Sequence, residues 1–391
     1  MALADRWLLP EGVQELLPAQ ARRVEFIRRR LLDLHACWGY ELVMPSVMEH
    51  LESLSAGAGR DLDLNTIKVT DQLSGHTLGL RADITPQVAR IDAHRLRESG
   101  VTRLCYCGSV FHALPTQPLA SRNPLQLGAE LYGHSGIESD VEVISLMVET
   151  LCAAGVDQEL SLDLGHVGVF SGLMRSVGLD EGQQEQYLDM LQRKALPELS
   201  LFVSGLDVEE AARKQLNELP RLNGAADVLV KAQELFSDAS EEVTSAIEYL
   251  QHLSERIALR FPELDQYFDL SELRGYNYHT GVVFAAYTPA FGQAIAKGGR
   301  YDNIGRDFGR ARAATGFSTD LKTLVELSSE QLGSIDQVLA PAIEDAALLT
   351  KVQQLRSEGI SVIYALPGEE SLSGCIAELV LRDGEWVVSD L

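Results

Sequence analysis

LQLGAELYG, residues 125–133, has apolar side chains in alternation with small or polar ones. This pattern indicates a β-strand that packs one face against a core. RLCYCGSVF, residues 103–111, is strand-like in the same way, and the residues between the two segments include three prolines among Ser, Thr and Asn. We therefore predict two strands joined by a long loop. The loop carries one charged side chain, Arg122, and long loops in compact domains are commonly functional.

Polar side chains recur at the ends of four predicted strands, in otherwise apolar surroundings. Such a pattern is typical of a pleated face that lines a pocket. Structural roles are open for each of them: Asp83 can cap a helix that begins at Thr85, and Glu130 can pair with Arg274 across the sheet. The four segments are LRADIT (80–85), LQLGAE (125–130), LRGYNYHTG (273–281) and KGGRYDN (297–303).

The remaining pattern predicts an α+β fold with a large antiparallel sheet flanked by helices. Strands and hairpins alternate with grouped helices rather than with single ones. We expect helices over 19–38, 85–99 and 138–155, a hairpin formed by 66–71 and 75–83, and a strand over 158–170. Helical periodicity then continues through an insertion at about 170–257, after which strand signals return.

Two domains are expected. Residues 1–329 form the main core, including the helical insertion, and residues 330–391 form a small α/β unit. In this unit a strand, a helix and a second strand precede a hairpin that turns at Asp383-Gly384.

The composition of the chain limits the classes of partner and ligand that we expect. The net charge of −24 repels polyanions, so we expect no nucleic-acid partner. The five cysteines lack the paired spacing of a zinc site, and we expect no metal, no cofactor and a cytoplasmic location. No apolar run reaches the roughly 18 residues of a membrane span. The glycines of GGRYDNIGRDFGR, residues 298–310, do not match a phosphate-binding loop.

The order of these segments resembles the catalytic core of class II aminoacyl-tRNA synthetases, and of histidyl-tRNA synthetase in particular. The helix ending in WGYELVMP resembles the first family motif, which forms a dimer interface, and LQLGAELYG resembles the second half of the second motif. LRADIT resembles the substrate segment LRPEGT, and LRGYNYHTGVVF resembles the histidine-specific segment RGLDYYTGxVFE. GGRYDN followed by ATGF resembles the third motif region, so the match runs from residue 10 to about 325.

The resemblance implies a histidine site. By this resemblance, Asp83, Thr85 and Gln126 would bind the α-amino and backbone groups of the amino acid, and Glu130 would bind its imidazole. Arg274 matches the arginine that faces the α-carboxylate or the acyl phosphate. Tyr278 and His279 stand where two tyrosines close the ring pocket. A carboxylate can accept an imidazole N–H, and a second one can hold the ammonium group.

Departures from the synthetase pattern fall on the nucleotide side. The family has FRxE where this chain has Phe111, His112, Ala113 and Leu114, and the terminal arginine of the third motif is absent from DLKTL, residues 320–324. Losing one such donor typically lowers a rate by about 10²–10³. We therefore expect neither adenylation nor tRNA charging.

This profile resembles the family of ATP phosphoribosyltransferase regulatory subunits. The resemblance implies a non-catalytic subunit that supports a short-form catalytic subunit, a glycosyltransferase, in the first step of histidine biosynthesis. It also implies L-histidine as an allosteric ligand and a homodimer, formed through residues 19–45, within a hetero-oligomer such as a hetero-octamer. The alternatives are a divergent histidyl-tRNA synthetase or another amino-acid ligase, and a stand-alone histidine-binding or RNA-regulatory module.

Overall fold

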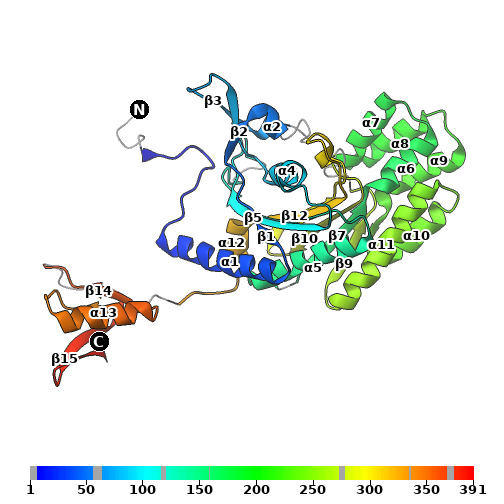
Figure 1. Ribbon diagram of the computed structural model, residues 1–391. Helices are drawn as coiled ribbons and strands as arrows, with labels where there is room; N and C mark the ends of the chain where they lie inside the picture. The colour runs from blue at the N-terminus through cyan, green and yellow to red at the C-terminus, as the bar shows by residue number, and fades with distance from the viewer. Residues whose placement is uncertain are drawn as a thin grey trace. The chain divides into compact units, whose positions relative to one another are not determined.

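The computed structural model describes residues 7–55, 64–115, 120–157, 159–272, 278–333, 336–367 and 374–391. The chain divides into two compact units, Met1–Ser329 and Glu330–Leu391, and each has its own sheet and apolar core. Figure 1 labels their helices and strands.

The larger unit is built on a nine-stranded sheet. Its strands are β1 (Glu41–Leu42), β5 (Thr102–Ser109), β6 (Leu125–Tyr132), β12 (Ala314–Asp320), β11 (Phe291–Arg300), β10 (Val282–Thr288), β7 (Ser161–His166), β9 (Asp265–Asp269) and β8 (Asn223–Gly224), in that spatial order. All pairings from β5 to β7 are antiparallel, as expected. The pairs β1–β5 and β7–β9 are parallel, so the sheet is mixed rather than wholly antiparallel.

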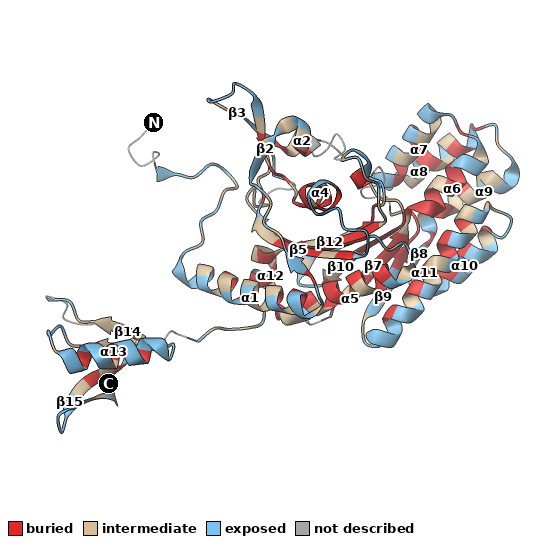
Figure 2. Cartoon of the chain, viewed as in Figure 1, coloured by how far each residue is buried: buried red, intermediate tan, exposed pale blue. Residues whose placement is uncertain are grey.

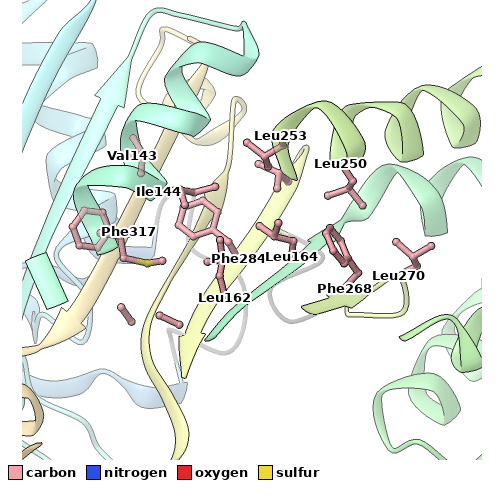
Figure 3. Packing of buried hydrophobic residues seen from close by; sticks show 14 of the residues in the cluster. Val143, Ile144, Leu162, Leu164, Leu250, Leu253, Phe268, Leu270, Phe284 and Phe317 are labelled. Atoms are coloured by element: carbon pink, nitrogen blue, oxygen red, sulfur yellow. The ribbon is translucent and has the colours of Figure 1, made fainter. Parts of the chain in front are cut away.

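Helices cover one face of this sheet and form the main core. They are α1 (Pro18–Cys37), α5 (Ile137–Ala153) and α12 (Leu321–Leu327). The predicted helix over 19–38 is confirmed, and its buried residues recur at helical spacing. Figure 3 shows Val143 and Ile144 of α5 close to Phe317 of β12 and Phe284 of β10, all members of one apolar cluster.

The other face carries a short helix, α4 (Thr85–Arg90), which Figure 1 shows on the opposite side of the sheet from α5. A helix was expected over 85–99. Instead, α4 continues as a π-helical segment, Ile91–Leu96, and the chain leaves it at Arg97 with a φ of 56°. Ile84 and Val88 pack here against Tyr106, Tyr132 and Tyr301 in a second, smaller core.

Helices occupy the segment for which an insertion was predicted. It comprises α6 (Val167–Val177), α7 (Glu181–Gln192), α8 (Leu196–Ser204), α9 (Glu210–Glu218), α10 (Asp227–Leu235) and α11 (Glu241–Arg260). The strand expected over 158–170 was too long, because β7 ends at His166, whose Nδ1 accepts a hydrogen bond from Gly168 N and caps α6. Leu250 and Leu253 of α11 lie next to Leu164 and Phe268 (Figure 3).

A three-stranded sheet completes the larger unit. It contains β2 (Met48–His50), β4 (Thr77–Leu80) and β3 (Ile67–Thr70), in that order, and β3 and β4 form the predicted hairpin. The short helix α2 (Leu51–Ser55) follows β2. In Figure 2 the buried residues of the larger unit follow the central strands and the inward sides of the helices.

The smaller unit has a four-stranded sheet in the order β14 (Ser361–Tyr364), β13 (Gln337–Ala340), β15 (Cys375–Arg382) and β16 (Glu385–Asp390), with helix α13 (Ala346–Ser357). The predicted hairpin turns at Asp383 and Gly384, whose φ values are 52° and 85°. Two successive positive φ values are typical of a two-residue hairpin loop. Within the described ranges, every helix is too short or too polar to span a membrane.

Candidate functional site

A cavity of about 240 Å³ lies over the central strands of the large sheet, on the side of α4. Its floor follows the strand register: Glu130 of β6 is opposite Gly316, which is opposite Gly299. The row continues through Val283 to Gly165. Three of these five positions are glycines, and the Cβ position of each is already occupied by neighbouring protein atoms.

Two glycines make room for specific cavity side chains. A Cβ atom at Gly316 would lie 1.5 Å from Oε2 of Glu130, and one at Gly299 would lie 2.7 Å from Nδ1 of His279. Real Cβ atoms do not approach that closely. The glycines of GGRYDN and ATGF are therefore needed for the positions that Glu130 and His279 adopt.

Glu130 is the most buried ionisable group of the cavity, with 1% of its surface exposed. Its Oε1 accepts a hydrogen bond of 3.0 Å from the Tyr106 hydroxyl, and its Oε2 accepts one from Tyr301. Burial raises the pKa of Glu130 to about 8, although the hydroxyl donors oppose this. Among the described residues the hydrogen-bond partners of Glu130 are hydroxyl groups. Arg274, considered from the sequence as its ion-pair partner, lies outside the described residues.

Asp83 and Thr85 stand at the start of α4. Asp83 Oδ1 accepts hydrogen bonds from Thr85 N at 3.0 Å and from Gln126 Nε2 at 2.8 Å. The N-cap position of α4 is occupied by Ile84, so Asp83 binds the first amide of the helix without being its N-cap residue. Gln126 also accepts from Ile84 N at 2.9 Å. Asp83 and Thr85 line the cavity, whereas Gln126 contacts Asp83 from behind and is not part of the lining.

Tyr278 and His279 also line the cavity. The Tyr278 ring stacks on Tyr301 with 5.1 Å between centroids, and its buried hydroxyl has no hydrogen-bond partner within the described part of the chain. His279 Nδ1 lies 3.3 Å from Arg300 O, and burial lowers the pKa of His279 to about 4. His279 is therefore neutral at pH 7. Arg274, the remaining predicted site residue, lies outside the described residues.

On the nucleotide side, basic groups are tied to backbone carbonyls. Arg122 Nε donates to His112 O at 2.9 Å, and Arg122 Nη1 donates to Glu11 O at 3.2 Å. His112 Nε2 lies 3.2 Å from Ala82 O. Lys322 Nζ, the cation nearest in sequence to the lost third-motif arginine, donates to Asn123 O at 2.7 Å. These contacts hold the loop and the N-terminal segment together.

The sequence analysis did not assign Tyr301 and Lys297, which line the cavity, or Tyr106, which donates a hydrogen bond to Glu130. Tyr301 and Lys297 belong to the quoted segment KGGRYDN, and Tyr106 to RLCYCG. A Cβ at Gly128, which faces Tyr106 across the β5–β6 pair, would lie 2.5 Å from the Tyr106 hydroxyl. A tyrosine opposite a glycine on paired strands was the available signal, but using it requires the register.

Within the described ranges, no group of three or more His, Cys, Asp or Glu side chains is arranged to hold a metal ion. The fold and the cavity define a protein of the class II aminoacyl-tRNA synthetase type. A family model described as histidyl-tRNA synthetase matches residues 12–324, and one described as the ATP phosphoribosyltransferase subunit HisZ C-terminal domain matches residues 336–389. The chain is 52% identical to the ATP phosphoribosyltransferase regulatory subunit of Stutzerimonas stutzeri over 396 aligned residues, which cover all of both chains. It therefore belongs to the ATP phosphoribosyltransferase regulatory subunit family.

Other known proteins agree with this assignment. The chain is 53% identical to the regulatory subunit of Azotobacter vinelandii, again over the whole of both chains. A solved structure from Bacillus halodurans, titled as an ATP phosphoribosyltransferase regulatory subunit/histidyl-tRNA synthetase, has a TM-score of 0.83 and 27% identity and covers 93% of this chain and 94% of its own. Histidyl-tRNA synthetase from Nostoc has a TM-score of 0.77 at 20% identity, covering 98% of this chain and 97% of its own, which supports the fold alone. The predicted α+β synthetase-like class is confirmed.

Proposed function

We propose that this regulatory subunit binds L-histidine in the cavity above the large sheet and transmits its presence to a short-form ATP phosphoribosyltransferase catalytic subunit. The observation that carries the proposal is the buried Glu130 carboxyl, which two tyrosine hydroxyls hold at one end of an amino-acid-sized cavity. An imidazole ring offers an N–H donor or, when protonated, a positive charge to such a group.

The rest of the ligand has partners among the other residues that line the cavity. Asp83 is the carboxylate for the ammonium group, and Thr85 lies beside it. The unpartnered Tyr278 hydroxyl is available to a polar group of the ligand, because a buried hydroxyl without a hydrogen bond is unfavourable. The neutral His279 does not repel a protonated imidazole. Arg274 keeps the carboxylate role that the resemblance gives it.

The subunit is proposed to be non-catalytic. His112 replaces the arginine of the second motif, and the Arg122 and Lys322 cations donate to backbone carbonyls. A phosphoryl group would have to displace these contacts before it could be gripped. The proposal includes no cofactor, no metal and no tRNA partner.

Assembly is proposed to involve a homodimer through residues 19–45, within a hetero-oligomer that includes the catalytic subunit, such as a hetero-octamer. Phe26, Leu42 and Met44 are large apolar side chains exposed on this segment, which supports an interface there. We place the complex in the cytoplasm, and the five free cysteines are in keeping with a reducing compartment.

Feedback requires that histidine prefer the less active assembly. A coupling of about 1–3 kcal/mol is typical of such regulation. A ligand with equal affinity for both states would shift neither.

The test is calorimetry of histidine binding, together with copurification of the full-length chain with a short-form catalytic subunit. We expect the two chains to copurify and histidine to bind in a one-to-one ratio per regulatory chain. Absence of histidine binding by both the chain and the complex would remove the sensor role. Histidine-dependent exchange between ATP and pyrophosphate would instead support the synthetase alternative. Histidine binding by a chain that copurifies with no catalytic subunit would support a stand-alone module.

A further inference from the structure

Lys297 is a cation in a cavity wall that is otherwise rich in carboxylates. It lies on β11, lines the cavity and has an exposed side chain. Among the described residues that line the cavity, Asp83, Glu130, Asp163, Asp269 and Glu272 are acidic and Lys297 is the one with a cationic side chain at pH 7. No described carboxylate lies within ion-pair distance of its ammonium group.

The register fixes where Lys297 stands relative to Glu130. Lys297 is opposite Ser318, which is opposite Gly128, so β11 lies two strands away from β6. On β11, Lys297 is two residues from Gly299, the position that the register places in line with Glu130. With strands about 4.8 Å apart and residues about 3.4 Å apart, the two Cα atoms are separated by roughly 12 Å. This separation leaves room for an amino acid whose ring contacts Glu130 to place its backbone groups between the two side chains.

Electrostatic effects on two histidines agree with this position. Burial is the main cause of the lowered pKa of both His279 and His112, and the Lys297 charge lowers both further. His279 belongs to the amino-acid wall, and His112 belongs to the nucleotide side. The Lys297 ammonium therefore acts on both halves of the cleft.

A cation in this cavity would offset the negative charge of an amino-acid carboxylate. A free amino acid is a zwitterion, and its carboxylate would be repelled by the acidic lining residues. Lysine supplies a compact charge with three N–H donors, which suits a carboxylate in a partly solvated cleft. The resemblance gives Arg274, which lies outside the described residues, one contact to this carboxylate, and Lys297 is the described lining residue able to supply another.

We propose that Lys297 binds the α-carboxylate of the amino-acid ligand and makes the cavity selective for the free amino acid over analogues that lack a carboxylate. The inference rests on the proposed function, because it assumes that the cavity takes histidine. It adds a specificity residue that discriminates histidine from its amino alcohol and its amide.

The experiment measures the affinity of the full-length chain, alone and with its catalytic partner, for L-histidine, L-histidinol and L-histidinamide by calorimetry. In the wild-type protein histidine should bind more tightly than both analogues. Lys297→Met should weaken histidine binding by about 10- to 100-fold, since a hydrogen bond to a charged group is lost. The same variant should change histidinol binding by less than about 3-fold, and Lys297→Arg should restore most of the histidine affinity.

Lys68→Met is the matched control, because Lys68 is also an exposed strand lysine but does not line the cavity. It should leave all three affinities unchanged. The inference is wrong if wild-type protein binds histidinol as tightly as histidine, or if Lys297→Met weakens the two equally; the proposed function survives both results. If wild-type protein and its complex bind no histidine at all, the proposed function and the inference fall together.

Discussion

Replacing Glu130 with glutamine should stabilise the free protein at alkaline pH. The Glu130 carboxyl is fully buried, and its pKa of about 8 lies well above the ordinary value of 4.5. Between these two values the folded state holds a proton that the unfolded state has released. Stability therefore falls as the pH rises from about 4.5, and the loss is complete above about 8.

The shift sets the size of the effect. At 1.36 kcal/mol per pKa unit, burial of the ionised carboxylate costs at most about 5 kcal/mol above pH 8 and almost nothing near pH 4.5. Glutamine keeps the shape without the charge. Its carbonyl oxygen can accept from one of the two tyrosines, Tyr106 or Tyr301, and its amide can donate to the other hydroxyl oxygen.

The assay is urea unfolding of the full-length protein at pH 5, 7 and 8.5 without ligand. Glu130→Gln should match the wild type at pH 5 and exceed its unfolding free energy by several kcal/mol at pH 8.5. Glu138→Gln, which removes an exposed carboxyl paired with Arg256, is the control and should show no such gain with pH. If the difference between Glu130→Gln and the wild type does not grow with pH, the burial argument for this carboxyl is refuted.

Three further predictions concern the cavity and its support. Gly316→Ala should remove histidine binding measured by calorimetry, because the new Cβ would overlap Glu130 Oε2, while Gly292→Ala on β11, with open space around its Cβ position, should bind normally. Histidine affinity should be highest between about pH 6.5, the ordinary pKa of imidazole, and about pH 8, the pKa of Glu130, because the free ligand and Glu130 together then hold the one proton that the complex needs. Below this range binding must release a proton, and above it binding must take one up. Calorimetry that shows no decline in affinity at pH 5.5 and pH 9 would contradict the pairing of the imidazole with Glu130. Arg300→Met should reduce the free energy of unfolding by about 3–5 kcal/mol, because it leaves the fully buried Asp140 without its ion-pair partner. Urea unfolding of the double variant Arg300→Met, Asp140→Leu should show that part of this lost stability returns.

Local pattern predicted the secondary structure where one periodicity dominates. The helix over 19–38 and the hairpin turn at Asp383-Gly384 follow from spacing and turn chemistry alone. The end of β7 did not, because HVGVF continues the apolar alternation of the strand while its His166 side chain caps a helix. The parallel pairs β1–β5 and β7–β9 depend on tertiary neighbours that no local pattern encodes.

The candidate site was also predictable only in part, because some of its residues matter only through their tertiary neighbours. Asp83, Thr85, Glu130, Tyr278 and His279 were singled out from the resemblance, and the structure places them around one cavity. Tyr106 and Tyr301 escaped notice because their importance comes from the Glu130 carboxyl on a neighbouring strand. Gln126 was expected to contact the ligand, but its amide is occupied by Asp83 and Ile84, a geometry that depends on where the α4 loop meets β6.

The most direct test of the account is the histidine titration of phosphoribosyltransferase activity in a complex reconstituted from this chain and a short-form catalytic subunit. Each complex is referred to its own activity without histidine. The account predicts that histidine inhibits the wild-type complex and that Glu130→Gln raises the half-inhibitory concentration by at least about 10-fold, the loss expected for one charge-assisted contact. Equal half-inhibitory concentrations for the two complexes would contradict the claim that this cavity senses histidine.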